Sequence, residues 1–240
     1  MKIIQKKDFV KNTLSSLHFK TFLLILSFFF GLGLISFSLI QPVNIGLTVL
    51  GFFVTIFSGY VIDQKLKEVN IWKAGLTGQE SVENVLSLLS DEWNLINNFK
   101  IPYKNCDIDH LLVGPKGIFL LETKNYHGKI ECVGDSWNYT KTGRNGGVYK
   151  GHINNPSKQL KRNVWELRSY LEKKISSPST GKFPYWIQGI LVFTNIHTEL
   201  KLQGETVVVL KTRQLISYLQ KFHSEPLTNR DIEIIMKELR

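Results

Sequence analysis

The longest uncharged stretch of the chain sets the first limit on its fold. No Asp, Glu, Lys or Arg occurs from Thr21 to Ile62, a run of 42 residues. An α-helix needs about 20 residues to cross the roughly 30 Å hydrocarbon core of a bilayer, so this run is long enough for two crossings. The Gln-Pro-Val-Asn segment at 41–44 interrupts it where a helix pair would turn. We therefore predict a transmembrane helical hairpin, with spans at about 21–40 and 43–62 in the lipid bilayer.

The charged residues that flank the run predict its orientation. Five lysines and one aspartate lie in the basic segment 1–20, and Lys65, Lys67 and Lys73 follow the second span. Lysine-rich flanks stay in the cytoplasm, so both termini are predicted to be cytoplasmic, in a multi-pass protein of a bacterial cell membrane. A cleaved signal peptide is the alternative for the first span, but its apolar run is too long and lacks a small-x-small cleavage site.

Small residues recur on both predicted spans. Gly51, Thr55 and Gly59 follow one another at four-residue spacing, as do Ser27 and Gly31. Residues four apart lie on the same face of a helix, and small side chains let two helix backbones approach closely. We expect these faces to pack against each other.

Residues 75–240 predict one mixed α/β domain after a juxtamembrane linker at 63–74. Helical periodicity follows Thr77, and Thr77 with Glu80 fits a capping box, so a helix is expected to begin there. Later short, largely apolar runs predict strands, and the glycine- and lysine-rich stretch 141–150 is expected to be a loop. The expected strands are 95–101, 108–113, 118–124, 129–133, 187–193 and 206–210. The expected later helices are 156–174, 213–222 and 229–239.

Two acidic residues in this domain are predicted to meet across a hairpin. If residues 114–117 form the turn, Asp109 lies directly opposite Glu122, with Cβ atoms roughly 4.5–5.5 Å apart. A three-residue turn would shift the register and separate the two acids. Lys124, two residues after Glu122, shares its face of the strand. Two adjacent carboxylates favour a bound Mg²⁺ ion (or Mn²⁺), completed by a backbone carbonyl and waters.

This arrangement is typical of metal-assisted phosphodiester hydrolysis, in which the ion polarises a phosphate oxygen and lowers the pKa of a water. Lys124 would orient or deprotonate the water, or offset charge that develops on the phosphate. The alternative is purely structural: Glu122 and Lys124 form an ordinary ion pair, and Asp109 caps a turn. Other chemistries lack their motifs. Cys106 and Cys132 form no Cys-x-x-Cys pair, and the sequence holds no phosphate-binding loop or Gly-x-Ser-x-Gly elbow.

Several stretches resemble the NERD (nuclease-related domain) family. They are GLTGQESVENVLSLL at 75–89, DIDHLLVGPKGIFLLETKNYHGKI at 107–130, Trp137, and NPSKQLKRN at 155–163. The resemblance covers about residues 75–175 and implies a restriction-endonuclease-like core of the PD-(D/E)XK superfamily. It also implies that Asp109 and Glu122 bind the metal, that Lys124 is the catalytic lysine, and that Gln159 faces the site from a helix.

One position departs from the family pattern. A Gly-Glu pair usually opens the first helix of the family, whereas an ungapped alignment places Gln79 in the glutamate position and Glu80 one residue later. Either Glu80 substitutes as a further catalytic acid, or it serves only as the partner of Thr77 in the capping box.

The charge distribution favours an anionic polymer as substrate. The chain carries 30 Lys and Arg against 20 Asp and Glu, and nine of these cations lie between 141 and 174. Such residues supply sequence-independent affinity for phosphates, although attraction to anionic lipid is an alternative for a membrane-anchored domain. The candidate substrate-binding residues are Arg144, Lys150, Lys158, Lys161 and Arg162.

Two functions are therefore expected of this chain. The first is metal-dependent cleavage of DNA, or of RNA, by a membrane-anchored domain that faces the cytoplasm. The second is a catalytically inactive module, tethered to the membrane, that binds nucleic acid or a partner protein. Binding of Mg²⁺ or Mn²⁺ by Asp109 and Glu122 would discriminate between them.

Overall fold

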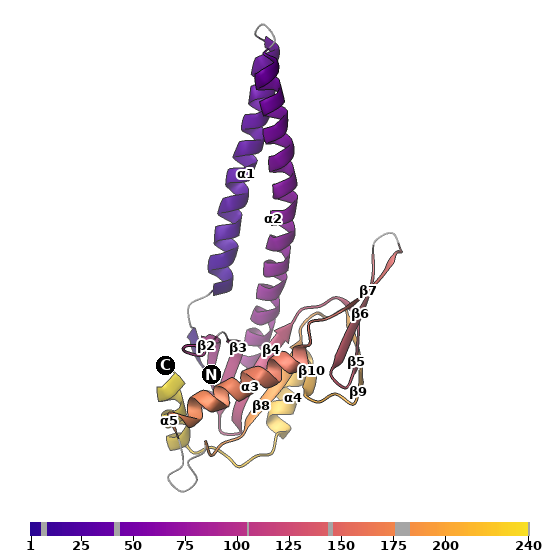
Figure 1. Ribbon diagram of the computed structural model, residues 1–240. Coiled ribbons are helices and arrows are strands. Elements are labelled where there is room, and N and C mark those ends of the chain that lie inside the picture. The colour runs from indigo at the N-terminus through magenta and orange to yellow at the C-terminus, as the bar shows by residue number, and fades with distance from the viewer. Residues whose placement is uncertain (6–8, 41–43, 105, 144–145, 176–182, 240) are drawn as a thin grey trace. The chain divides into compact units, whose positions relative to one another are not determined.

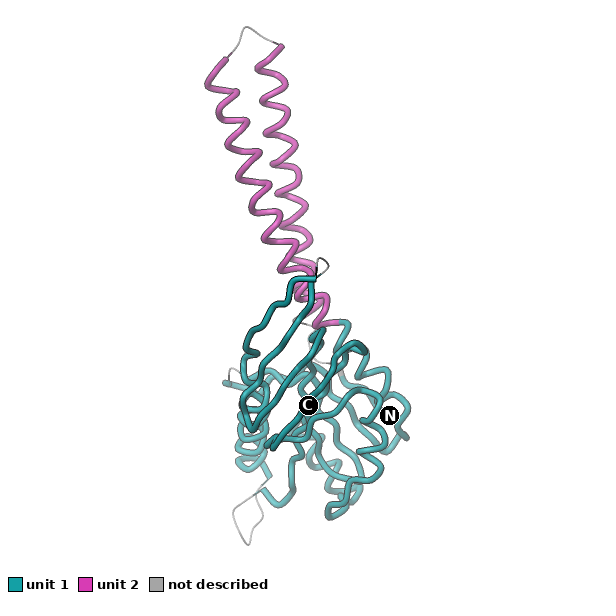
Figure 2. The backbone as a smooth tube through the Cα atoms, turned by 90° about the vertical axis from the view of Figure 1, so that its right-hand side faces the viewer, with its two compact units in different colours: residues 1–7, 77–240 teal, residues 8–76 magenta. Residues whose placement is uncertain are grey.

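The computed structural model describes residues 1–5, 9–40, 44–104, 106–143, 146–175 and 183–239 (Figure 1). The chain divides into two compact units, which Figure 2 shows in different colours. One unit comprises Asp8–Leu76, and the other comprises Met1–Lys7 and Thr77–Arg240. We refer to them as the helical unit and the α/β unit.

The helical unit is built from α1 (Phe9–Ile40) and most of α2 (Ile45–Leu86). Both helices are long and apolar enough to cross a membrane, and the most apolar window of each is only 11% buried. The predicted turn at 41–43 lies outside the described residues, but the expectation of two apolar helices is confirmed.

Small residues bring these two helices into close contact, as their spacing predicted. Ser27 Oγ and Ser58 Oγ lie 3.0 Å apart in a hydrogen bond between the helices. A Cβ atom added at Gly31 would lie 2.5 Å from Thr55 Oγ1, and one at Gly51 would lie 2.7 Å from an Ile35 side-chain carbon. A larger side chain at either glycine would therefore force the helices apart.

The predicted helix start at Thr77 is wrong. Helix α2 runs without a break from Ile45 to Leu86, so residues 77–80 are interior helical positions and form no capping box. In the charged stretch after the apolar run, ion pairs one turn apart stabilise the helix. Lys67 pairs with Asp63 at 2.6 Å, and Lys65 pairs with Glu68 at 2.7 Å. No proline separates the two segments, so helical periodicity before and after residue 77 belongs to one element.

The α/β unit contains a mixed six-stranded sheet. Its strands, in spatial order, are β1 (Lys2–Gln5), β2 (Asn94–Lys100), β3 (Asp107–Gly114), β4 (Gly117–Lys124), β8 (Ile187–Phe193) and β10 (Val208–Lys211). Strands β2, β3 and β4 are antiparallel neighbours, whereas β1 is parallel to β2, and β4, β8 and β10 are mutually parallel. The predicted strands of this sheet are confirmed to within about two residues, a usual uncertainty at element ends; β1 was not predicted.

A second sheet has four strands. In spatial order they are β7 (Val148–His152), β6 (Ser136–Thr142), β5 (Gly128–Val133) and β9 (Thr198–Gln203). The predicted loop at 141–150 is therefore wrong, because its two ends pair as the β6–β7 hairpin. Trp137 of β6 is buried and donates an indole hydrogen bond to Ser157 Oγ at 2.8 Å, which ties this sheet to the following helix.

Helices cover both faces of the six-stranded sheet (Figure 1). Helix α3 (Pro156–Glu172) and helix α5 (Asn229–Leu239) share one apolar cluster with the sheet. The end of α2 and helix α4 (Leu215–Lys221), which follows a 3-10 turn at Thr212–Gln214, share the other. The expected mixed α/β fold with two preceding apolar helices is confirmed.

Candidate active site

The register of the β3–β4 hairpin is the one that the expected turn predicts. Val113 pairs with Ile118, and the paired positions run from Gly114 with Gly117 to His110 with Leu121, one position before Asp109 and Glu122. The turn is tighter than expected, because Gly114 also pairs with Gly117, but this leaves the predicted register unchanged. Glu122 lies on the face that α3 covers, since Gln159 of α3 contacts it. Asp109 instead contacts Gln79 of α2, a helix that packs on the opposite face of the sheet.

Glu122 lies at the centre of a polar cluster beneath α3. Its side chain is 3% exposed, and Oε1 accepts hydrogen bonds from Lys124 Nζ and Gln159 Nε2, each at 2.6 Å. Lys124 Nζ also donates to Gln159 Oε1 at 3.1 Å, which closes a three-residue ring. The structure therefore brings Glu122, Lys124 and Gln159 together.

Asn163, which the sequence did not single out, completes the surroundings of Glu122. Its Nδ2 atom lies 3.4 Å from Glu122 Oε2 and donates at 3.1 Å to the carbonyl oxygen of Asp107. Its Oδ1 atom accepts from the Cys106 thiol at 3.2 Å. Asn163 follows Gln159 by one helical turn on α3, which is the spacing that could have indicated it.

Asp109 is fixed by three donors. Its Oδ2 atom accepts from the backbone N–H of Thr123 at 2.8 Å and from the Thr123 hydroxyl at 2.7 Å. Its Oδ1 atom accepts from Gln79 Nε2 at 2.8 Å. These bonds hold the carboxylate against the end of β4, next to Glu122.

Gln79, and not Glu80, contacts Asp109. Both residues lie inside α2, where successive side chains are about 100° apart around the axis, so only one of the pair faces the sheet. Gln79 is half-buried and contacts Asp109, whereas Glu80 is exposed. The structure therefore does not bring Glu80 to the acids, and a neutral amide occupies the position next to Asp109.

The electrostatics of the cluster follow from its burial. Burial, together with the negative charge of Asp109, raises the pKa of Glu122 to about 7, while Lys124 and Arg162 oppose this shift. Burial lowers the pKa of Lys124, but the adjacent Glu122 carboxylate outweighs that effect and the pKa is raised. Lys124 is therefore an ammonium at neutral pH, which favours charge stabilisation over proton abstraction as its role.

His110 lies on the opposite face of β3, as the alternation of the strand predicts. It is 1% exposed, and its Nδ1 atom lies 2.7 Å from Asn97 Oδ1, while Asn97 Nδ2 donates to Glu83 at 2.8 Å. Burial lowers the pKa of His110 to about 4, so the ring is neutral at physiological pH. It takes no part in the acidic cluster.

The predicted substrate-binding cations occupy different environments. Lys158 and Arg162 are exposed on α3, and Arg162 is close enough to Glu122 to lower its pKa. Lys161 forms an ion pair with Asp135 at 2.8 Å, and Lys150 lies exposed on β7 of the second sheet. Arg144 lies outside the described residues. The structure thus brings Arg162 near the acids and leaves Lys150 on a separate sheet.

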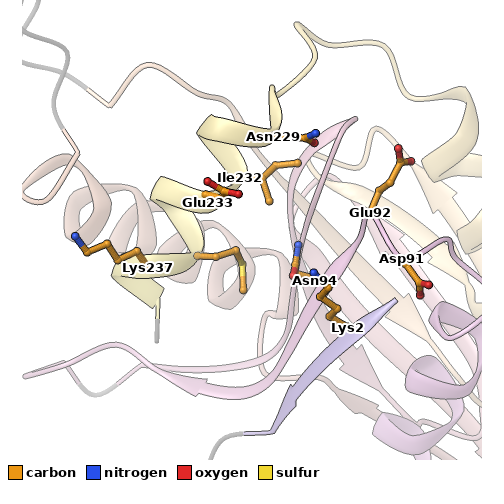
Figure 3. A pocket seen from close by; sticks show the side chains of 9 residues that line it. Lys2, Asp91, Glu92, Asn94, Asn229, Ile232, Glu233 and Lys237 are labelled. Atoms are coloured by element: carbon orange, nitrogen blue, oxygen red, sulfur yellow. The ribbon is translucent and has the colours of Figure 1, made fainter.

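A cavity elsewhere in the α/β unit contains none of the predicted site residues. It has a volume of about 620 Å³ and lies between β1, β2 and α5 (Figure 3). Side chains of both charges line it, including Lys2, Glu92, Glu233 and Lys237. Among the residues that the structure describes, no group of three or more His, Cys, Asp or Glu side chains is placed to hold a metal.

A buried acid that binds a lysine and a helix-borne glutamine, on a mixed sheet, is consistent with a nuclease-like α/β domain. Comparison with known families agrees, because residues 74–194 match the model of the NERD (nuclease-related) domain. The chain belongs to this family. It is also 25% identical over 175 residues to the uncharacterized protein pXO1-01 of Bacillus anthracis, covering 70% of this chain and 76% of that protein. No solved structure shows significant similarity to the chain.

Proposed function

We propose that the protein is a membrane-anchored nuclease that hydrolyses DNA phosphodiester bonds with Mg²⁺ or Mn²⁺, with RNA as an alternative substrate. The observation that carries the proposal is the buried Glu122 carboxylate bound to Lys124 and Gln159, with Asp109 near enough for its charge to raise the pKa of Glu122. Two further points support the proposal. The chain belongs to the nuclease-related family, and that family is assigned to the PD-(D/E)XK superfamily.

The donor set fits a hard divalent cation. Both acids offer carboxylate oxygens. Burial, together with the negative charge of Asp109, raises the pKa of Glu122, and a cation shared by the two acids would offset their repulsion. Two protein carboxylates are sufficient, because Mg²⁺ usually keeps several waters and binds one or two carboxylates plus substrate phosphates. When bound, the ion would polarise a phosphate oxygen and promote deprotonation of a water.

The residues around the acids have separate roles in this proposal. Lys124, held as an ammonium, stabilises negative charge that develops on the phosphate. Gln159 holds both neighbouring side chains in place, because it donates to Glu122 and accepts from Lys124. Gln79 and Thr123 orient Asp109 by donating hydrogen bonds to its carboxylate. Arg162 and Lys158, exposed on α3, attract the phosphate backbone.

Two observations support the proposed membrane anchor, namely the two apolar helices and the position of β1. The apolar faces of α1 and α2 are largely exposed, and lipid would cover them. Strand β1 precedes α1 but pairs with β2 in the α/β unit, so the segments on both sides of the hairpin belong to one folded sheet. Both must then lie on the same side of the bilayer, which the lysine-rich flanks indicate to be the cytoplasm.

A catalytically inactive binding module is the second candidate, and the identity of Gln79 favours it. An amide at this position cannot serve as a third anionic ligand, so the cation would depend on Asp109 and Glu122 alone. In that case the basic face of α3 would still bind nucleic acid, but no cleavage would follow.

A cleavage assay with matched variants separates the two candidates. Purified full-length protein is incubated with plasmid, linear duplex and single-stranded DNA or RNA, with Mg²⁺, Mn²⁺ or EDTA. We expect metal-dependent cleavage that Asp109→Asn and Glu122→Gln each abolish, and that Lys124→Met lowers at least about 100-fold. Glu92→Gln, which alters an exposed acid outside the cluster, should leave the rate unchanged. Metal-dependent activity that survives in Glu122→Gln would refute the assignment.

A further inference from the structure

A groove on the α/β unit exposes two tryptophans. It has a volume of about 490 Å³ and lies between α3 and the start of β8, with Val207 on its border. Trp165 of α3 is 61% exposed, and Trp186, just before β8, is 66% exposed. Large aromatic side chains that are exposed in a groove more often indicate a binding surface than a surface without a partner.

Hydrogen bonds hold the surroundings of these indoles in place. Trp186 Nε1 donates to Gln188 Oε1 at 3.2 Å, and Gln188 Nε2 in turn donates to the carbonyl oxygen of Gly189 at 2.9 Å. The indole N–H is therefore satisfied, which leaves the aromatic face as the part of Trp186 available for a ligand. Trp165 is carried by α3, a 17-residue helix whose other face is packed in the core.

The groove has cations but no acid among its lining residues. Arg168 donates to the carbonyl oxygens of Tyr185 at 3.2 Å and Phe183 at 3.0 Å, and these bonds hold its guanidinium at the border of the groove. Lys161 also lines the groove, although Asp135 pairs with it. An apolar aromatic floor with a positive border is complementary to a ligand that combines flat rings with negative charge.

We propose that this groove binds a single-stranded stretch of nucleic acid, with bases stacked on Trp165 and Trp186 and phosphates directed to the cations of α3. The proposal rests on the proposed function and specifies its substrate. Gln159, which contacts Glu122, and Trp165 are six residues apart on α3, or about 9 Å along the helix axis and roughly 120° around it. The groove and Glu122 therefore lie on different sides of α3. A duplex hides the faces of its bases, whereas a single strand presents them.

Binding of oligonucleotides without metal tests this proposal independently of cleavage. Full-length protein in EDTA is titrated with a fluorescent oligothymidine and with an abasic oligonucleotide of equal length and charge. Wild type is compared with a Trp165→Leu/Trp186→Leu variant, which keeps the bulk but cannot stack, and with Trp165→Phe/Trp186→Phe, which can. We expect the leucine pair to weaken binding of oligothymidine at least about five-fold and that of the abasic strand not at all. The phenylalanine pair should retain most of the affinity.

Other results overturn the proposal. Equal loss for the two strands, no loss for either, or no binding of oligothymidine by wild type would exclude stacking in the groove. Self-association that the leucine pair abolishes, with oligothymidine affinity unchanged, would identify a second copy of the chain as the occupant. If the leucine pair melts early, protection of wild-type tryptophans from acrylamide by oligothymidine, but not by the abasic strand, is the deciding measurement. Cleavage without base-dependent binding would refute only the groove; base-dependent binding without cleavage would refute only the nuclease function.

Discussion

At the scale of single residues, the sequence predicts the charged members of the site better than their neutral partners. The register predicted for the hairpin is confirmed, and the structure brings Glu122, Lys124 and Gln159 together. Gln159 was identified only by the family resemblance. The resemblance also placed Gln79 in the position of the family's glutamate, but not as a donor to Asp109. Thr123 and Asn163 were missed, because their contacts join separate segments of the chain. Glu80 was chosen for its charge, but helix geometry turns it to solvent.

The raised pKa of Glu122 predicts a pH-dependent stability. The folded chain holds the proton of this carboxyl up to about pH 7, whereas the ordinary value is 4.5, so the folded state binds more protons between these limits. The free energy of unfolding should therefore decrease as pH rises through this window and level off above it. Relative to Glu122→Gln, metal-free wild type should lose up to about 3 kcal/mol. Urea unfolding from pH 4.5 to 8 measures this difference, and parallel curves for the two proteins would contradict it.

The neighbouring positions 79 and 80 provide a matched test of the site. Gln79→Ala removes the donor to Asp109 Oδ1 and should lower the cleavage rate at least about ten-fold, because the carboxylate loses one of its three orienting bonds. Glu80→Ala changes an exposed side chain on the same helix and should alter the rate less than about two-fold. Rates under single-turnover conditions measure both effects. A larger loss from Glu80→Ala than from Gln79→Ala would restore Glu80 as the functional residue.

At the scale of elements, apolar strands were predictable and polar ones were not. The strands at 108–113, 118–124 and 187–193 carry apolar runs at 111–113, 118–121 and 190–193, as expected of buried strands. The stretch 141–150, where β6 and β7 meet, is rich in Lys and Gly and resembles a loop, because its largely exposed residues are held by strand pairing and not by burial. The false helix start at Thr77 has a different cause, because a capping motif has no meaning inside a helix that continues.

Strand β1 provides a test at this scale. Ile4 packs against the apolar core, whereas its neighbour Ile3 is 43% exposed on the other side of the strand. Ile4→Asp should lower the stability of the α/β unit by about 1–3 kcal/mol, because a charged group would replace a partly buried apolar one. Ile3→Asp should change it by less than about 0.5 kcal/mol. Urea unfolding followed by tryptophan fluorescence compares the two, and equal effects would show that β1 does not pack in solution.

At the scale of the whole molecule, one uncharged run predicts the division of the chain into a helical unit and an α/β unit. The sequence could not show that residues 2–5 return to the sheet of the α/β unit, since four residues before an apolar helix carry no recognisable strand signal. If the hairpin crosses a membrane, this pairing predicts that both of its ends emerge on the same side, in agreement with the prediction from the charged flanks.

Labelling of single cysteines in intact cells tests this topology. Ile3→Cys and Leu88→Cys lie exposed on the α/β unit, and Asn44→Cys lies exposed at the start of α2. A membrane-impermeant maleimide should label only Asn44→Cys until the cells are permeabilised, when all three react. The native Cys106 and Cys132 are buried, so wild type provides the unlabelled control. Labelling of Ile3→Cys and Leu88→Cys in intact cells would reverse the orientation, and labelling of only one of them would exclude the hairpin.

The central claim is that Asp109 and Glu122 share a divalent cation, and direct metal binding tests it most simply. Titration of Mn²⁺ into full-length protein, followed by electron paramagnetic resonance of the free ion, counts bound metal without requiring cleavage. We expect a bound ion in wild type whose affinity falls as pH decreases below about 7, when Glu122 becomes protonated. Glu122→Gln and Asp109→Asn should each abolish it. Binding that persists unchanged in both variants, or no binding in wild type at pH 8, would contradict the claim.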